Sequence, residues 1–259
     1  MQKLNEAHSS DDEGLSEGWI DAVREQRWNE AALAQTVTDA HWRVWRYREP
    51  AVVLGRSQHR LVLPEGEGLL PLVKRGAGGG AVLVGPWLLS ASIVLPPDDP
   101  RVTSVSVADS YRWLGEVMVA VLAELGVKAR AMPPAERIAA PPELGWACFA
   151  GVAPWEVVVR DERGSEEGAV RWRKLIGFAQ RRTRHGVLLA LGVLMRPSPW
   201  LRLAERLGED LAGAEVLAQT TVGLSELLPE PVPDERFLAL LRPRLAPIRE
   251  VGMPDGRVL

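Results

Sequence analysis

The residues best suited to chemistry in this sequence are its single cysteine, Cys148, and a lysine 26 positions later, Lys174. A lone thiol cannot be half of an internal disulfide, so it is either a small buried hydrophobe or a nucleophile. Lys174 opens the mostly apolar segment 174–180, KLIGFAQ, where an ammonium group can neutralise an oxyanion or a phosphate, or favour the thiolate of a nearby cysteine. A strand lysine with its head group in water is an equally weighted alternative.

The surroundings of Cys148 leave both of its interpretations open. Trp146, Phe149 and Trp155 flank it, which fits a packed and inert thiol. No histidine lies within 30 residues, so activation of a nucleophile would fall to lysine or to backbone amides. The case for a nucleophile therefore depends on other motifs in the chain.

A glycine-rich segment is the second candidate site. After Lys74 and Arg75, glycine occupies positions 76, 78, 79 and 80. Such a backbone can approach a ligand closely and present several N–H groups, and Arg75 can add a charge-assisted hydrogen bond. The segment matches neither a Walker loop nor GxGxxG. A ligand-binding loop is favoured over a flexible hairpin turn, because three consecutive glycines exceed what a turn needs.

The elements that must position these residues follow from apolar patterning and from glycine and proline breaks. Strands are predicted over 43–47, 51–54, 69–73, 81–84, 88–95, 155–160, 170–176 and 187–195. Helices are predicted over 19–33, 104–125, 199–207 and 234–241. The first two strands are expected to adjoin, and the last three to form an antiparallel meander. The proline-rich stretch 129–146 is predicted to be an extended loop that leads to Cys148.

Composition predicts one globular domain over 15–259, after a disordered acidic tail over 1–14. The chain has 259 residues, 46% apolar and 25% charged. No signal peptide or membrane-spanning run is present, and a single cysteine suits a reducing compartment, so a cytoplasmic location is expected. Four scattered histidines lack ligand spacing, so no metal is expected.

Charge gives little reason to expect nucleic acid or a membrane as a partner, because the formal net charge is −3. Basic residues concentrate locally near the lysine segment. They are Arg171, Arg173, Lys174, Arg181, Arg182, Arg184 and His185. This concentration could meet phosphates or an acidic partner protein, and a solvated strand face is equally weighted.

Three motifs in order resemble the superfamily of lipoate protein ligase A, biotin protein ligase and octanoyltransferase. Residues 47–58, YREPAVVLGRSQ, look like its first strand pair ending in Gly-x-x-Gln. Residues 74–82, KRGAGGGAV, look like its acyl-binding glycine loop, and 174–180 look like its lysine motif. The resemblance covers about residues 19–230. It implies an α+β fold with a mixed, largely antiparallel β-sheet flanked by helices.

The resemblance also implies acyl chemistry. Lipoyl or octanoyl groups would be attached to a lysine of a small acceptor, with an acyl carrier protein, a lipoyl domain or a glycine cleavage H-type protein as partners. The spacing of Cys148 resembles that in octanoyltransferases, so Cys148 would accept the acyl group, Lys174 would position and activate it, and no cofactor would be required. Further substrate-binding residues carried over are Arg75, Gly78, Gly79, Gly80, Val82, Gly177, Ala179 and Gln180.

Two alternatives remain. In an ATP-dependent lipoate protein ligase, which uses ATP and Mg²⁺, Lys174 would contact the acyl-adenylate phosphate and Cys148 would only be packed. In a non-catalytic binder, the protein would recognise an acyl ligand or lipoyl domains. The chain departs from the family where it has Val84-Gly85 in place of His-Asp, and Ser90 in place of a common Asn. These departures predict a divergent substrate or a specialised acceptor.

Overall fold

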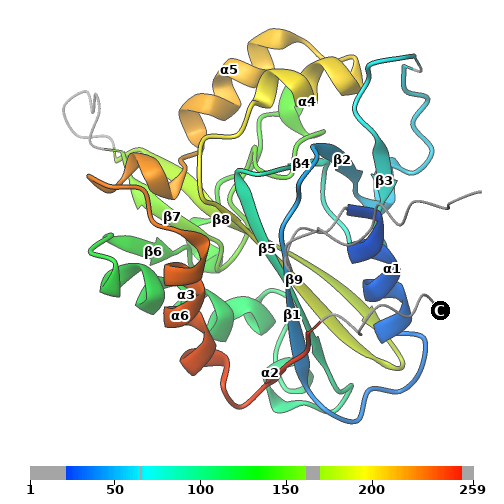
Figure 1. The fold of residues 1–259 in the computed structure, drawn as a ribbon, viewed down its shortest axis with the longest axis vertical. Coiled ribbons are helices and arrows are strands. Elements are labelled where there is room, and N and C mark those ends of the chain that lie inside the picture. Colours follow the sequence, from blue (N-terminus) through cyan, green and yellow to red (C-terminus); the bar gives the residue numbers. More distant parts are fainter. Residues whose placement is uncertain (1–21, 65, 162–169, 253–259) are drawn as a thin grey trace, which may run out of the picture.

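The computed structural model describes residues 22–64, 66–161 and 170–252. The predicted acidic tail over 1–14 lies outside them. Two sheets form the centre of the molecule (Figure 1). The larger has the strand order β10-β1-β5-β9-β8-β7-β6, and the smaller has the order β3-β2-β4. All pairs in the larger sheet are antiparallel except β1 with β10, so the predicted mixed, largely antiparallel α+β fold is confirmed.

The strands of the large sheet are mostly buried. They comprise β1 (His41–Trp45), β5 (Leu88–Leu95), β6 (Ala129–Ala131), β7 (Val157–Arg160), β8 (Trp172–Thr183), β9 (Gly186–Leu194) and β10 (Arg249–Glu250). Every residue of β5 is buried, which explains its nearly continuous apolar run. The predicted meander over β7, β8 and β9 is confirmed. β8 is longer than predicted, because pairing with β9 carries it through polar residues to Thr183.

The small sheet corrects one expectation. It contains β2 (Ala51–Leu54), β3 (Leu72–Lys74) and β4 (Val82–Val84), with β2 in the middle. The predicted adjoining of the first two strands is therefore wrong, since β1 pairs with β5 and β2 pairs with β3 and β4. The segment between them, which ends at Pro50, takes the chain from one sheet to the other, and proline cannot donate to a strand ladder.

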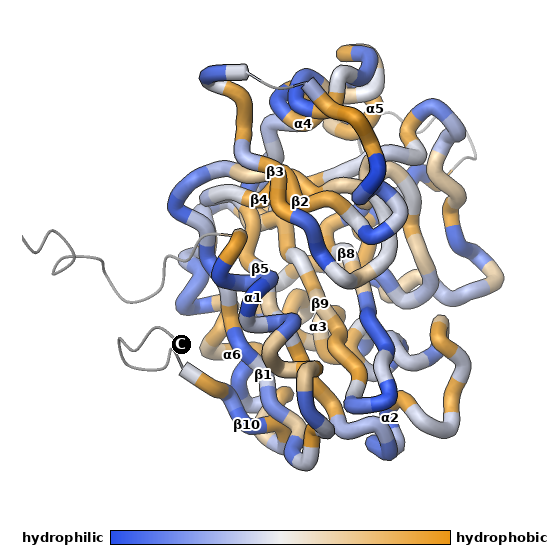
Figure 2. Tube along the Cα trace, turned by 90° about the vertical axis from the view of Figure 1, so that its right-hand side faces the viewer, coloured by the Kyte–Doolittle hydropathy of each residue, from blue (hydrophilic) through white to orange (hydrophobic). Residues whose placement is uncertain are grey.

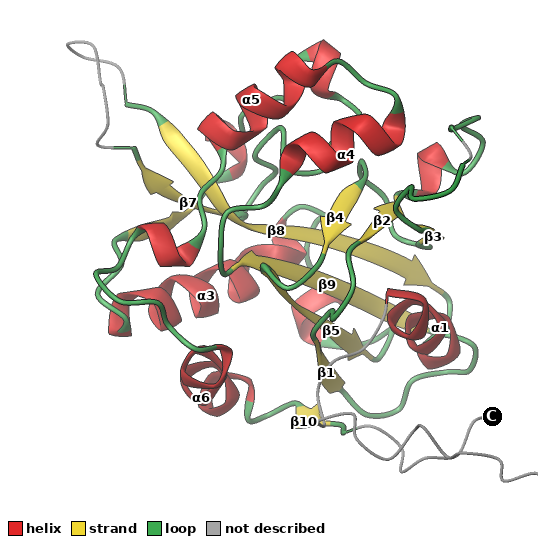
Figure 3. Ribbon diagram, turned by 45° about the horizontal axis from the view of Figure 1, so that its top comes forward, coloured by secondary structure: helices red, strands yellow, loops and turns green. Residues whose placement is uncertain are grey.

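Within the part of the chain that the structure describes, six α-helices cover the sheets. They are α1 (Ala22–Ala32), α2 (Pro100–Thr103), α3 (Arg112–Glu124), α4 (Trp200–Leu207), α5 (Leu211–Thr220) and α6 (Asp234–Leu245). The helices α3 and α6 pack together below the large sheet in Figure 3, whereas the small sheet, α4 and α5 lie above it. Figure 2 shows apolar residues gathered where β2, β4 and β5 meet. One continuous apolar core joins both sheets.

Two other local predictions need correction, and one helix was not predicted. The helix predicted over 104–125 begins at Arg112, because Val105 and Val107 are exposed and Ser106 forms a turn by accepting a hydrogen bond from the N–H of Asp109. The stretch 129–146 is not wholly a loop, since β6 pairs with β7. The helix α5 lies in a segment for which no element was predicted, and its start is capped by the Asp210 carboxylate.

The remaining helix predictions are confirmed within the described residues. The structure shows α1, α4 and α6 close to their predicted positions, and Gly126 ends α3 with a left-handed φ of 84°. Among the helices of the described ranges, none is both long and apolar enough to cross a membrane.

Candidate functional site

The cysteine segment is hydrogen-bonded to the end of the glycine loop. The N–H of Ala81 donates to the carbonyl of Trp146 at 2.7 Å, and the N–H of Cys148 donates to the carbonyl of Ala81 at 2.9 Å. The side-chain amide of Gln58 also donates to the Trp146 carbonyl, at 2.9 Å. Three segments that are distant in sequence therefore hold the half-buried thiol in one place.

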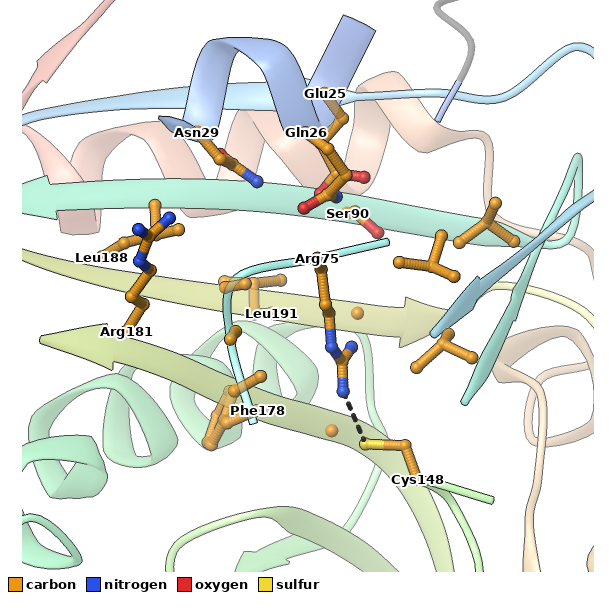
Figure 4. A pocket seen from close by; sticks show the side chains of 18 of the residues that line it. Glu25, Gln26, Asn29, Arg75, Ser90, Cys148, Phe178, Arg181, Leu188 and Leu191 are labelled. Carbon is orange, nitrogen blue, oxygen red and sulfur yellow. Dashed lines mark hydrogen bonds between the residues drawn. The ribbon is translucent and has the colours of Figure 1, made fainter. Parts of the chain in front are cut away.

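The guanidinium of Arg75 contacts the thiol. Its Nη2 donates to the carbonyls of Gly78 at 2.8 Å and Gly80 at 3.0 Å, and it lies 3.7 Å from the Sγ of Cys148 (Figure 4). The side chain is buried, so water screens its charge only weakly. The guanidinium is thus placed to stabilise negative charge on the sulfur or on an oxygen bound beside it.

Lys174 contacts the cysteine segment through the main chain and not through the thiol. Its Nζ donates to the carbonyls of Cys148 and Gly151, both at 3.0 Å, and lies 2.6 Å from Oε2 of Glu156. These three partners match the three donors of an ammonium group, and the residue is 1% exposed. The alternative of a lysine head group in water is wrong. The role of Lys174 in positioning and activating Cys148 stays a prediction, and the cation that contacts the sulfur itself is Arg75.

Glu156 is a site residue that sequence reasoning missed. Its carboxylate accepts hydrogen bonds from the N–H groups of Ala153 at 2.7 Å and Phe178 at 2.9 Å, besides pairing with Lys174. Trp155, just before it, has a left-handed φ of 66°, which is unusual for a large side chain and aims the chain into β7. The sequence did contain a signal for Glu156, namely an acid directly before the apolar run 157–159. That run forms β7, which pairs with the strand β8 that carries Lys174.

The thiol lies between a pocket and a more open groove. The pocket runs between α1, the small sheet, β5 and β9, and five of the predicted site residues line it. These are Arg75, Val82, Cys148, Gly177 and Ala179. Gly79 and Gly80 line the groove on the other side of the sulfur, together with residues 138–140 and 152–154. A chain bound in the pocket could therefore react with a group that enters through the groove.

Three predicted site residues lie outside both cavities. Gly78 is exposed and takes part through its carbonyl, which accepts from Arg75. Gln180 points its amide away, toward the carbonyl of Val107 and the hydroxyl of Ser110. Lys174 is buried beneath the cysteine segment.

The basic concentration around β8 does not form one patch. Arg173 is buried and donates to the carbonyl of Thr221, and Arg181 pairs with Glu30. The exposed Arg171 and Arg184 lie beyond opposite ends of β8, roughly 40 Å apart at about 3.3 Å per residue. Burial and pairing therefore divide the cluster between the two ends of β8. Arg182 and Arg184 stay exposed together at one end, so docking of phosphates or an acidic partner there remains a prediction.

A buried acid lies at the α1 end of the pocket. The hydroxyl of Tyr47 donates to Oε2 of Glu25 at 2.8 Å, and both residues are buried. Burial raises the pKa of Glu25 to about 6, although the Tyr47 hydrogen bond and the charge of Arg75 oppose this shift. The pKa of Tyr47 is also raised, chiefly by burial and then by the charge of Glu25.

The raised pKa of Glu25 predicts that the free energy of unfolding falls as the pH rises. Because its pKa is higher in the folded protein than the ordinary 4.5, the folded state binds more protons, so the stabilisation is present below pH 4.5 and is lost as the pH rises through 6. Glu25→Gln cannot ionise. Relative to the variant, the native protein should lose about 2 kcal/mol of unfolding free energy between pH 4 and 7.5. Urea denaturation across this range measures the difference, and parallel pH profiles would contradict it.

Metal ligands do not gather here. Within the ranges 22–64, 66–161 and 170–252, no three histidine, cysteine or acidic side chains are placed to hold a metal ion together.

Comparison with known proteins agrees with the three sequence motifs. The family model of the lipoyl protein ligase A/B catalytic domain matches residues 21–239. An octanoyl-[GcvH]:protein N-octanoyltransferase of Lysinibacillus sphaericus is 31% identical over 179 residues, which cover 66% of this chain and 54% of that protein. The match therefore spans about half the length of this relative.

Solved structures show the same fold. A bipartite lipoate protein ligase from Thermoplasma acidophilum has a TM-score of 0.62 at 18% identity, covering 92% of this chain and 88% of that one. A lipoate-protein ligase A bound with ATP has a TM-score of 0.61 at 17% identity, covering 92% and 90%. The predicted resemblance is confirmed: the chain belongs to the family of the lipoyl protein ligase A/B catalytic domain.

Proposed function

We propose that the protein transfers an octanoyl or lipoyl group to a lysine of a small acceptor domain, through a thioester on Cys148. The observation that carries the proposal is the placement of the sulfur at the junction of pocket and groove, 3.7 Å from the Arg75 guanidinium. An acyl chain in the pocket would present its carbonyl carbon at this junction. The octanoyltransferase relative supports the same class of reaction.

The reaction would take place in two steps. The Cys148 thiolate attacks the carbonyl carbon of a donor thioester, Arg75 stabilises the oxyanion, and the donor leaves as a thiolate when its carbon–sulfur bond breaks. The amine of the acceptor lysine then attacks the Cys148 thioester. An amide bond forms, the second carbon–sulfur bond breaks, and the amine proton passes to the departing sulfur or to water. Because one thioester replaces another in the first step, ATP is not required.

The buried ion pair favours this route over the ATP-dependent one. In the ligase alternative Lys174 would contact the phosphate of an acyl adenylate. Here its ammonium is occupied by Glu156 and two carbonyls, so contact with a phosphate would require breaking a buried ion pair. Arg75, whose Nη2 faces the thiol, is the cation left to act on the acyl group.

Covalent capture tests the proposal. The protein mixed with an octanoylated acyl carrier protein or an octanoylated H-type protein, without ATP, should gain one octanoyl group by intact mass. Cys148→Ala should gain none, because its methyl group cannot accept an acyl group. The relevant control is Arg27→Ala on α1, an exposed residue outside the pocket, which should acylate normally.

Two other outcomes would replace this proposal. Transfer that needs ATP, Mg²⁺ and free lipoate and that survives Cys148→Ser would establish the ligase. Tight binding of a lipoyl domain without any turnover or adduct would establish the non-catalytic binder. An octanoyl adduct that persists on Cys148→Ala would also overturn the role of the thiol.

A further inference from the structure

The α1 end of the pocket carries polar groups that a plain acyl chain cannot satisfy. Glu25, Asn29 and Ser90 line the same pocket as Cys148, and they are 6%, 4% and 6% exposed. Figure 4 shows Glu25 and Asn29 extending from α1 toward Ser90 on β5, across the pocket from Cys148. A methyl terminus would meet buried hydrogen-bonding atoms there.

Asn29 supplies the unused acceptor. Its Oδ1 is buried and has no hydrogen-bond partner, while its side chain also lies within hydrogen-bonding reach of Glu25. Because the ionised carboxylate of Glu25 only accepts hydrogen bonds, the NH2 of Asn29 is the group that donates to it, and Oδ1 is left without a partner. A buried acceptor without a partner costs free energy, and a ligand with an N–H or O–H group would remove that cost.

Arg75 supplies the unused donor near the sulfur. Its Nη2 is bonded to the glycine loop, but its Nε is buried and has no partner. A carbonyl or oxyanion beside Cys148 would accept from it. The pocket therefore offers a free donor near the reacting end and a free acceptor near α1.

We propose that the pocket selects an acyl group whose chain carries a hydroxyl or amide N–H, with this donor bonded to Oδ1 of Asn29. The inference rests on the proposed function, since it concerns the acyl group that Cys148 would receive. Ser90 stands where the family commonly has an asparagine and lies within hydrogen-bonding reach of Tyr47, so Ser90, Tyr47 and Glu25 form one polar group at this end.

Binding of free acids tests the inference without any acyl transfer. Octanoic acid is compared with 8-hydroxyoctanoic acid, and the same pairs of six and ten carbons allow for the depth of the pocket. At the best length, the hydroxy acid should bind about tenfold or more tightly than the plain acid, since satisfying a buried acceptor is worth about that factor. Calorimetry measures each dissociation constant.

Asn29→Leu should reverse this preference, because leucine offers a methyl surface in place of the acceptor. The exposed Arg27→Ala on the same helix should keep it. Plain acids that bind as well as hydroxy acids at every length on the native protein would overturn the inference, with no need for a variant. An unchanged ratio in Asn29→Leu that thermal unfolding shows to be folded would do so too.

The two proposals fail in different ways. When the acids are supplied as thioesters, a Cys148 adduct without preference for the hydroxyl would reject only the inference about the acyl chain. Hydroxyl-dependent binding of the free acids, with no adduct from any thioester, would reject only the transfer mechanism.

Discussion

Glu156→Leu is expected to lower the free energy of unfolding by about 3–5 kcal/mol, because it leaves the ammonium of Lys174 buried without its counter-ion. The pair lies in the interior, with Glu156 and Lys174 each 1% exposed, so little water can replace the lost partner. The variant also leaves the N–H groups of Ala153 and Phe178 without their acceptor. Chemical denaturation of the variant and the native protein measures the loss.

A double variant separates the charge from the packing. Glu156→Leu combined with Lys174→Met removes both charges and keeps similar volumes, so it should recover much of the stability lost by the single variant. It should not recover acylation of Cys148, because the carbonyls of Cys148 and Gly151 have lost the donor that holds the loop. A single variant that loses under 1 kcal/mol would show that the pair is not a structural requirement.

The Lys174–Glu156 pair also shows how far the sequence alone could predict the site. Apolar neighbours made Lys174 a candidate site lysine, although a head group in water had equal weight, and apolar runs predicted β5, β7 and β9. The identity of its partner was not recognisable, because it depends on how β7 pairs with β8. That register shifts between Val157 and Val158, and such an irregularity has no signature in one sequence.

The contacts around the thiol were likewise only partly predictable from the sequence. The glycine loop and Cys148 were each predicted as site elements, and the structure brings them together at Ala81. Which cation would face the sulfur depended on the path of the loop. Lys174 extends from β8 to the carbonyl of Cys148. Arg75 instead folds back across its own loop to the carbonyls of Gly78 and Gly80. Contacts among distant segments decide which cation lies beside the sulfur, and local sequence does not encode them.

A second large effect is expected at Gly55, which lies outside the glycine loop but packs against its backbone. A Cβ on Gly55 would lie 1.7 Å from the carbonyl oxygen of Gly79, so backbone has to move. Gly55→Ala should cost about 3 kcal/mol, at the upper end of overpacking, and should displace the loop that holds Arg75 beside Cys148. Urea denaturation measures the cost, and the rate of octanoyl adduct formation measures the displacement.

Gly78→Ala is the matched control, because it adds the same methyl group to the same loop. No atom lies within 4 Å of a Cβ on Gly78, and its φ is not positive, so alanine fits without strain. Its stability should be unchanged or higher by about 0.5 kcal/mol, since alanine restricts the unfolded chain. Acylation of Cys148 should stay near the native rate, because the Gly78 carbonyl can still accept from Arg75. Equal losses in both variants would mean that flexibility of the loop, and not close approach at Gly55, determines its function.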